Sequence, residues 1–176
     1  MPRLPIDLPS LARAATALAA ATGAGALLWL AGCDQKRAET LEEGVATEAD
    51  VRRQFGAPAA VFDEPDGGRT LDYPRQPEGL TNFLITIGPD GKLSALRQVL
   101  KPADFGRIQP GMTQDEVRRR LGRPARTQRY ALKRQEVWDW RWADGPTTRR
   151  FSVTFDDAGR VKGSAVSDDV KINGEQ

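Results

Sequence analysis

The sequence contains no histidine among its 176 residues and only one cysteine, Cys33. The absence of histidine excludes Ser-His-Asp triads, general-base catalysis by imidazole and the commonest protein ligand of zinc. A single cysteine excludes an internal disulfide, a Cys-x-x-Cys redox pair and a thiolate cage around a metal. We therefore expect a protein that is not an enzyme and that has no metal site and no dissociable cofactor.

A strong excess of charge of one sign is also lacking, since 26 Lys and Arg stand against 24 Asp and Glu, a net charge of +2. Proteins that bind nucleic acid through its phosphates present a strongly basic face. We therefore expect no nucleic-acid partner. With 39% hydrophobic and 28% charged residues, most of the chain has the composition of an ordinary folded domain.

The N-terminal part of the chain differs in composition from the rest. Arg3 and Arg13 precede an uncharged, Ala- and Leu-rich run at 14–30, and small residues follow it before Cys33. A basic start, an apolar middle and a small-residue end are typical of a secretory signal. A transmembrane helix is the weaker interpretation, because the run is at the short limit for spanning and contains two glycines. We predict a signal peptide at 1–32.

The end of this segment, Leu30-Ala31-Gly32-Cys33, resembles the lipobox of bacterial lipoproteins. The resemblance implies cleavage between Gly32 and Cys33, a diacylglycerol on the Cys33 thiol and an acyl chain on its new amine. Several acyl chains, each contributing about 0.8 kcal/mol per buried methylene, hold a protein on a membrane where one does not. The alternative is an inert, buried cysteine, and the end of a signal is a poor place for one. Polar residues at 33–40 are expected to form a tether.

Two later stretches share one pattern. In each, a threonine is followed three residues on by an acidic residue, then by two apolar residues four apart, and then by Gly-x-Pro. The residues are Thr47, Asp50, Val51, Phe55, Gly56 and Pro58, and, 66 positions on, Thr113, Glu116, Val117, Leu121, Gly122 and Pro124. A threonine N-cap with an acidic residue at its third position starts a helix, and Gly followed by Pro ends it. The repeat predicts a duplicated unit with one short helix in each copy.

Strand patterns follow each predicted helix. Residues 137–142 alternate strictly, which places three tryptophans on one face and Asp139 and Arg141 on the other. Residues 150–155 alternate in the same way, a turn follows, and a third strand is expected from Val161. In the first unit, Leu71 and Tyr73 take the place of the tryptophans. Because so short a helix needs a partner, its apolar edge must cover the aromatic face of the sheet.

These patterns predict an α+β fold with two tandem units, each a short helix packed on a small antiparallel sheet. The expected divisions are a signal peptide at 1–32, a tether at 33–40, a divergent first unit at 41–101, a second unit at 102–166 and a polar tail at 167–176. The Pro-containing stretch at 101–104 is expected to join the units.

The second unit resembles the BamE (SmpA/OmlA) family of bacterial envelope lipoproteins. The resemblance rests on Ile108–Thr113, Val117, Leu121–Pro124, Trp138, Trp140 and Phe151–Phe155. It implies a non-catalytic accessory protein on the periplasmic face of the outer membrane, which supports β-barrel assembly through protein contacts and anionic lipid headgroups. Family members typically have one such unit, so two are a departure. Asp34, directly after Cys33, leaves the inner membrane open as the location, because aspartate there favours retention in enteric bacteria.

Basic residues concentrate at 107–134, where nine Lys and Arg side chains stand against two acidic ones. Arg118, Arg119 and Arg123 are the candidates for binding anionic headgroups or an acidic partner, and a solvated helix face is the alternative. Asp139 and Arg141 are candidates because a concave sheet would present their polar face for recognition. The tryptophan stripe is either a binding platform or, as we favour, core beneath the helices.

Tandem units of this kind also resemble the β-lactamase inhibitor protein, which binds its target on a concave sheet. That resemblance implies an alternative function, the inhibition of a periplasmic or secreted enzyme, with aromatic side chains exposed on the sheet. A carboxylate-based hydrolase would need two converging acidic side chains. The adjacent pairs Asp156/Asp157 and Asp168/Asp169 do not meet this need, because neighbouring strand residues point to opposite faces.

Overall fold

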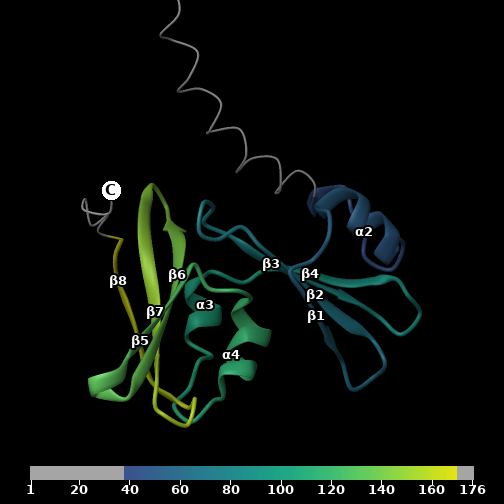
Figure 1. Ribbon diagram of the computed structural model, residues 1–176. Coiled ribbons are helices and arrows are strands. Elements are labelled where there is room, and N and C mark those ends of the chain that lie inside the picture. The colour runs from purple at the N-terminus through teal and green to yellow at the C-terminus, as the bar shows by residue number, and fades with distance from the viewer. Residues whose placement is uncertain (1–37, 170–176) are drawn as a thin grey trace, which may run out of the picture.

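A computed structural model describes residues 38–169, in which two four-stranded antiparallel sheets follow one another along the chain (Figure 1). The predicted signal peptide and Cys33 lie outside the described residues. The α+β prediction is confirmed. The elements are α2 (Glu48–Phe55), β1 (Ala60–Asp63), β2 (Arg69–Pro74), β3 (Asn82–Ile87), β4 (Leu93–Gln98), α3 (Pro102–Phe105), α4 (Gln114–Leu121), β5 (Arg126–Tyr130), η1 (Ala131–Lys133), β6 (Gln135–Asp144), β7 (Thr147–Phe155) and β8 (Val161–Asp168).

Both sheets have the same simple order, β1-β2-β3-β4 and β5-β6-β7-β8, with each strand antiparallel to the next. Both also carry a register shift between their last two strands, at Thr86/Ile87 and at Thr154/Phe155. This shared irregularity supports the duplication that the sequence predicts. The predicted junction at 101–104 forms most of the one-turn helix α3, and β8 extends two residues into the predicted tail.

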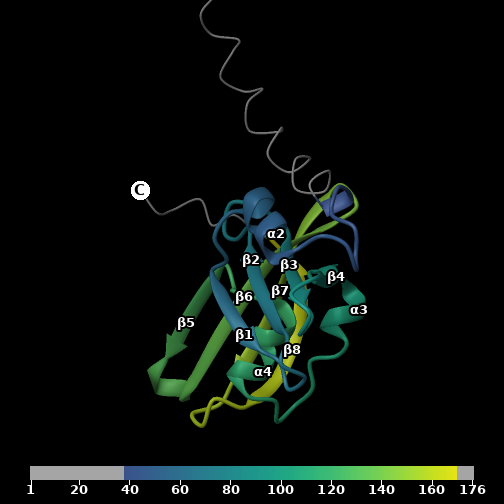
Figure 2. The ribbon, with the colours of Figure 1, turned by 90° about the vertical axis from the view of Figure 1, so that its right-hand side faces the viewer.

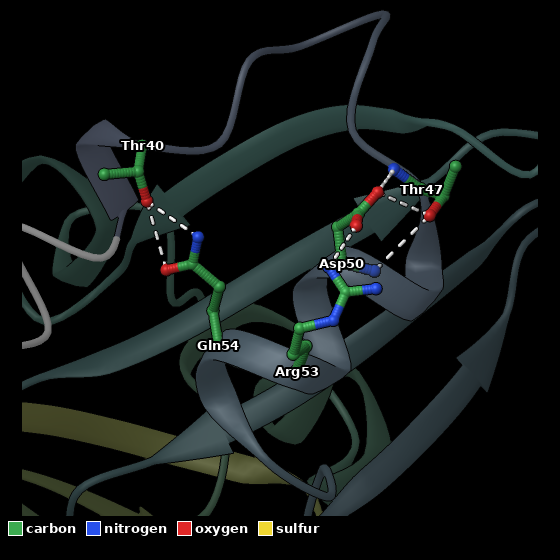
Figure 3. A network of polar contacts seen from close by, with 5 residues as sticks. All are labelled: Thr40, Thr47, Asp50, Arg53 and Gln54. Carbon is green, nitrogen blue, oxygen red and sulfur yellow. Dashed lines mark hydrogen bonds and ion pairs between the residues drawn. The ribbon is translucent and has the colours of Figure 1, made fainter.

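The two longer helices begin and end where the sequence predicts. The Thr47 hydroxyl accepts a hydrogen bond from the Asp50 amide at 3.3 Å, and the Thr47 amide donates one to the Asp50 carboxylate at 3.0 Å (Figure 3). Thr113 and Glu116 form the same reciprocal pair in α4, at 3.2 and 2.7 Å. These capping boxes satisfy amides that a helix start otherwise leaves open. In Asp50, hydrogen bonds from the side chain and backbone of Thr47 lower the pKa to about 2.

Each unit has its own apolar core. In the first unit, Val51 and Phe55 of α2 pack against Leu71, Tyr73 and neighbouring strand residues. In the second, the corresponding α4 residues pack against the tryptophan face of β6 and the phenylalanines of β7. The interpretation of the tryptophan stripe as core is therefore confirmed: Trp140 and Trp142 are buried and Trp138 packs against the same cluster.

Helix α4 lies between the two sheets (Figure 1). Its apolar edge faces the second sheet, whereas side chains at its C-terminal end meet the first sheet on the face opposite α2. The first sheet is therefore packed between two helices, one from each unit. Among the described residues, no helix is long and apolar enough to cross a membrane.

Candidate interaction surfaces

The end of α4 forms a polar seam with the first unit. The Arg118 guanidinium lies 3.3 Å from Asp72 Oδ2 on β2, and the Arg123 amide donates to the same oxygen at 3.1 Å. Asp72 is fully buried, while the Arg118 side chain keeps 27% of its exposure. Arg118, predicted as a surface candidate, therefore holds the two units together in this structure.

Burial raises the pKa of Asp72, although Arg118 and the Arg123 amide act in the opposite direction. Its second oxygen, Oδ1, has no hydrogen-bond partner among the described residues. A buried carboxylate so incompletely paired is costly to ionise, since both charge and lone pairs have left water. Asp72 is therefore the residue of the seam whose protonation matters most.

Gly122 ends α4 with a φ of +71°, and its position also brings the two units close together. A Cβ atom there would lie 2.5 Å from Asp72 Oδ1 and 3.1 Å from Asn82 Nδ2. Asn82 Nδ2 donates to the carbonyls of Leu121 at 2.7 Å and Arg123 at 2.9 Å. An asparagine from the first sheet therefore caps the carbonyl end of a helix in the second unit.

A second polar contact joins the units at Arg141. Gln76 donates from Nε2 to the Arg141 carbonyl at 2.7 Å and accepts the Arg141 amide at 3.2 Å. The Arg141 guanidinium donates to the Pro77 carbonyl at 2.8 Å and to Asp169 at 2.7 Å. Burial tends to raise the pKa of Asp169, but hydrogen bonds from Arg141 and Arg150 outweigh it, and the pKa is lowered.

The remaining predicted candidates are placed differently. The Arg119 side chain pairs with Asp115 at 2.8 Å, donates to the Asp63 carbonyl at 3.2 Å and lies over the Phe62 ring. Asp139 accepts the Ser152 hydroxyl at 2.6 Å on the polar face of the second sheet. Arg123 is exposed, and only its backbone takes part in the seam. The five candidates therefore do not converge on one site.

Sequence reasoning missed Asp72, Gln76 and Asn82. Asp72 and Asn82 occupy alternate positions in strands, where a polar residue normally faces water. Their burial comes from a helix end 39 to 51 residues further along the chain, as the separations of their hydrogen-bond partners show. No local pattern carries that information.

Four exposed basic residues lie on the β5–β6 hairpin: Arg126, Arg129, Lys133 and Arg134. Every residue of β5 except Gln128 is exposed, including Arg126 and Arg129. At the tip, Tyr130 is 40% exposed and Leu132 is completely exposed, at 103%. We call residues 126–134 the hairpin surface. It lies at the opposite end of the molecule from α2 and the start of the described chain (Figures 1 and 2).

A shallow pocket of about 280 Å³ lies beside the hairpin surface, and its lining mixes charges of both signs, among them Arg129, Arg134, Glu136 and Asp157. Arg134 is already paired with Asp157. Between residues 38 and 169, no three His, Cys, Asp or Glu side chains lie close enough together to hold a metal ion.

Comparison with known proteins gives one family match and a few solved structures. Residues 98–165 match the family described as the outer membrane protein assembly factor BamE domain. A structure of a putative osmotically inducible lipoprotein, OsmE, is 27% identical, covering 40% of this chain and 82% of that one, with a TM-score of 0.35. No curated protein matches the chain.

Two further structures cover more of the chain at lower identity. A DUF4309 family protein (YjgB) from Bacillus subtilis is 15% identical over 75% of this chain and 84% of that one, with a TM-score of 0.31. A putative β-lactamase inhibitor protein from Streptococcus mutans is 12% identical over 77% and 94%, with a TM-score of 0.28. The resemblance predicted from sequence is confirmed where its motifs lie: the match begins at the last residue of β4 and covers the second unit from α3 through most of β8, which is therefore similar to the BamE domain.

Proposed function

We propose that this chain is a lipid-anchored accessory protein of the bacterial envelope that faces the periplasm and assists the assembly of outer-membrane β-barrel proteins. The observation that carries the proposal is the match of residues 98–165 to a domain family described as an outer-membrane assembly factor. Its role is non-catalytic, and it acts through contacts with envelope proteins and with anionic lipid headgroups.

In this proposal Cys33 carries the diacylglycerol and an N-acyl chain after cleavage behind Gly32. Residues 34–37 then connect the anchor to the first described residue, and a chain this short spans only about 15 Å when extended. The outer membrane is the proposed location, and Asp34 keeps the inner membrane as the alternative.

The hairpin surface is the proposed contact with protein partners. A fully exposed leucine and a half-exposed tyrosine among arginines combine apolar anchors with positive charge, a combination that fits an apolar pocket with an acidic rim. The hairpin surface lies at the end of the molecule opposite the start of the described chain, and so away from the proposed anchor (Figure 1). This position favours a protein, and not the anchoring membrane, as its partner. Arg123, exposed at the start of the same region, extends the positive surface.

The inhibitor function has weaker support. It predicts aromatic side chains exposed on a sheet, whereas Trp140 and Trp142 are buried and Trp138 packs against the core. We therefore keep it only as an outcome of the experiment below.

The test is detergent capture of the acylated chain from its own envelope, with partners identified by mass spectrometry. We expect recovery of barrel-assembly proteins by the parent chain, and reduced recovery by Leu132→Glu, which places a negative charge at the hairpin tip. Thr113→Ala is a matched control, because it weakens a helix cap without touching the hairpin. Recovery of a single periplasmic enzyme in place of assembly proteins would favour inhibition and contradict the proposal.

A further inference from the structure

The last strand of the described residues, β8, has an open edge, and comparison with the first unit shows why. Each sheet ends in a strand whose first residue is covered by the loop before the helix. Leu93 exchanges backbone hydrogen bonds with Gly44 and Ala46, at 2.8 and 2.7 Å. Val161 does the same with Gly111 and Met112, both at 2.8 Å. The two units are equivalent up to this point.

They differ at the next outward-facing amide. In the first unit, the Leu96 amide of β4 donates to the carboxylate of Glu43, the residue before Gly44, at 3.3 Å. The equivalent residue of β8 is Ser164, because Leu96 pairs with Ile85 as Ser164 pairs with Val153, each just beyond the register shift. The residue before Gly111 is Pro110, which has no carboxylate.

In the part of the chain that the structure describes, the backbone groups on the outer edge of β8 are therefore unpaired. The Leu96 amide points away from its own sheet, so the amide of the equivalent residue, Ser164, does so too. Because the amides of a strand alternate in direction, the Val166 amide also points outward. Within residues 38–169, no hydrogen bond reaches this edge beyond Val161. Residues 164–168 are all exposed. An unpaired row of amides and carbonyls is a template for another strand.

The other edges are shorter, charged or covered. Strand β1 has only four residues, and the carbonyl of its last residue, Asp63, accepts a hydrogen bond from the Arg119 side chain. Strand β5 carries two arginines in five residues. Strand β8 has eight residues, and between Lys162 and Asp168 it contains only Gly, Ser, Ala and Val. It lacks the inward charges and prolines with which proteins usually protect an edge.

The side chains of β8 define what a bound strand must look like. On the helix-covered face, Val166 is 47% exposed beside Phe151, so an added strand would place apolar side chains there. On the other face, Gly163 and Ala165 are small and lie beside Thr154 and Ser152, which suits small or polar side chains. The matching ligand is an amphipathic strand with alternating apolar and polar residues.

We propose that β8 binds an extended, amphipathic strand of an unfolded outer-membrane β-barrel protein by adding it to the second sheet. Transmembrane barrel strands have this alternation of apolar and polar residues. The choice of a barrel strand as the ligand rests on the proposed function, whereas the open edge rests on the hydrogen bonds alone. The backbone of β8 would supply affinity, and the alternation of side chains on its two faces would supply selectivity.

The test uses the full mature chain, with Cys33→Ser to keep it in solution, and a fluorescent ten-residue peptide of alternating valine and threonine. Binding is measured by anisotropy, and amide hydrogen exchange locates it. We expect slower exchange at Ser164 and Val166 on binding. A peptide of the same composition with the valines grouped at one end should bind more weakly.

Two pairs of variants test the edge itself. Ser164→Pro removes the outward amide, and because that amide serves no bond within its own sheet, proline is tolerated there. We expect about tenfold weaker binding, the value of one backbone hydrogen bond, while Ser164→Ala binds as the parent does. Pro110→Glu places a carboxylate where Glu43 stands in the first unit and should weaken binding, whereas Pro110→Ala should not.

Equal binding by the parent, Ser164→Pro and Pro110→Glu would overturn the proposal, as would protection at any site other than β8. Self-association that Ser164→Pro abolishes would also overturn it, because the ligand would then be a second copy. If the peptide fails to bind while envelope capture still recovers assembly proteins, the edge proposal fails and the proposed function stands. If the peptide binds while capture recovers no assembly proteins, the proposed function fails and strand binding at the β8 edge stands.

Discussion

Replacing Asp72 with asparagine should leave the fold stable at neutral pH, while replacing it with alanine should not. Asparagine keeps an oxygen for the Arg123 amide and removes a buried charge whose Oδ1 has no partner among the described residues. It loses the attraction to Arg118, which is partly exposed and can turn to water. We expect Asp72→Asn to lie within about 1 kcal/mol of the parent free energy of unfolding. Asp72→Ala leaves both donors without an acceptor and should cost about 3 kcal/mol.

The same residue should impose a pH dependence of a definite sign. Burial raises the pKa of Asp72 in the folded chain above its ordinary value, so the folded state holds this proton more tightly than the unfolded state. The resulting stabilisation is fully present below the unfolded pKa of about 4 and is lost as the pH rises through the raised folded pKa. The parent should therefore lose stability relative to Asp72→Asn as the pH increases from about 4.

Urea unfolding of residues 33–176 at a series of pH values measures both effects. All three tryptophans in this range lie on β6 and report on the second unit, while circular dichroism reports on both units. If Asp72→Asn costs as much as Asp72→Ala at pH 7, the ionised carboxylate is essential to the seam and the reasoning is refuted. A stability difference between parent and Asp72→Asn that is independent of pH would refute it equally.

Three further substitutions have expected outcomes. Gly122→Ala should cost more than about 2 kcal/mol in urea unfolding, because its Cβ meets Asp72 and its φ is positive; a cost below 0.5 kcal/mol would show that the seam can open freely. Thr113→Ala should cost about 1 kcal/mol through loss of the cap, and Thr113→Ser should restore most of it in the same assay. Leu132→Ser should leave the unfolding midpoint unchanged, since the side chain is fully exposed, but should reduce capture of envelope partners; a lowered midpoint would show an unrecognised packing role.

The sequence predicts the local parts of this fold well because local chemistry determines them. Thr113 and Glu116 start α4 by bonding to each other, and Gly122 ends it through its positive φ, so three residues define the helix. The alternation around Trp140 predicts a strand with one buried face, since the period of side chains in a strand is two. The repeat predicts the second copy of each feature.

Features that depend on distant segments could not be predicted. Strand β5 has no apolar alternation, because it is an exposed edge that hydrogen-bonds to β6 without burying a face. Arg118 belongs to a run of arginines typical of a solvated helix face, and its partner Asp72 lies 46 residues away. Only the packing of one unit against the other reveals that this arginine is structural.

The open edge of β8 could be predicted only in part from the sequence. The residues Glu43 and Pro110 are visible in the sequence, but their significance depends on which amide each one faces. Because the unit is duplicated, the two copies can be compared directly. In the first copy a carboxylate covers the edge strand, and in the second copy the equivalent strand lacks that carboxylate.

The most direct test of the central claim is the amount of folded β-barrel protein in outer membranes of cells that lack this chain. Folded barrels resist unfolding in detergent without heat and can be counted by their shifted migration on gels. We predict that this amount falls in the deletion strain, returns when the parent chain is restored, and does not return with the Cys33→Ser chain. Unchanged amounts of folded barrel protein in the deletion strain would contradict a role in barrel assembly.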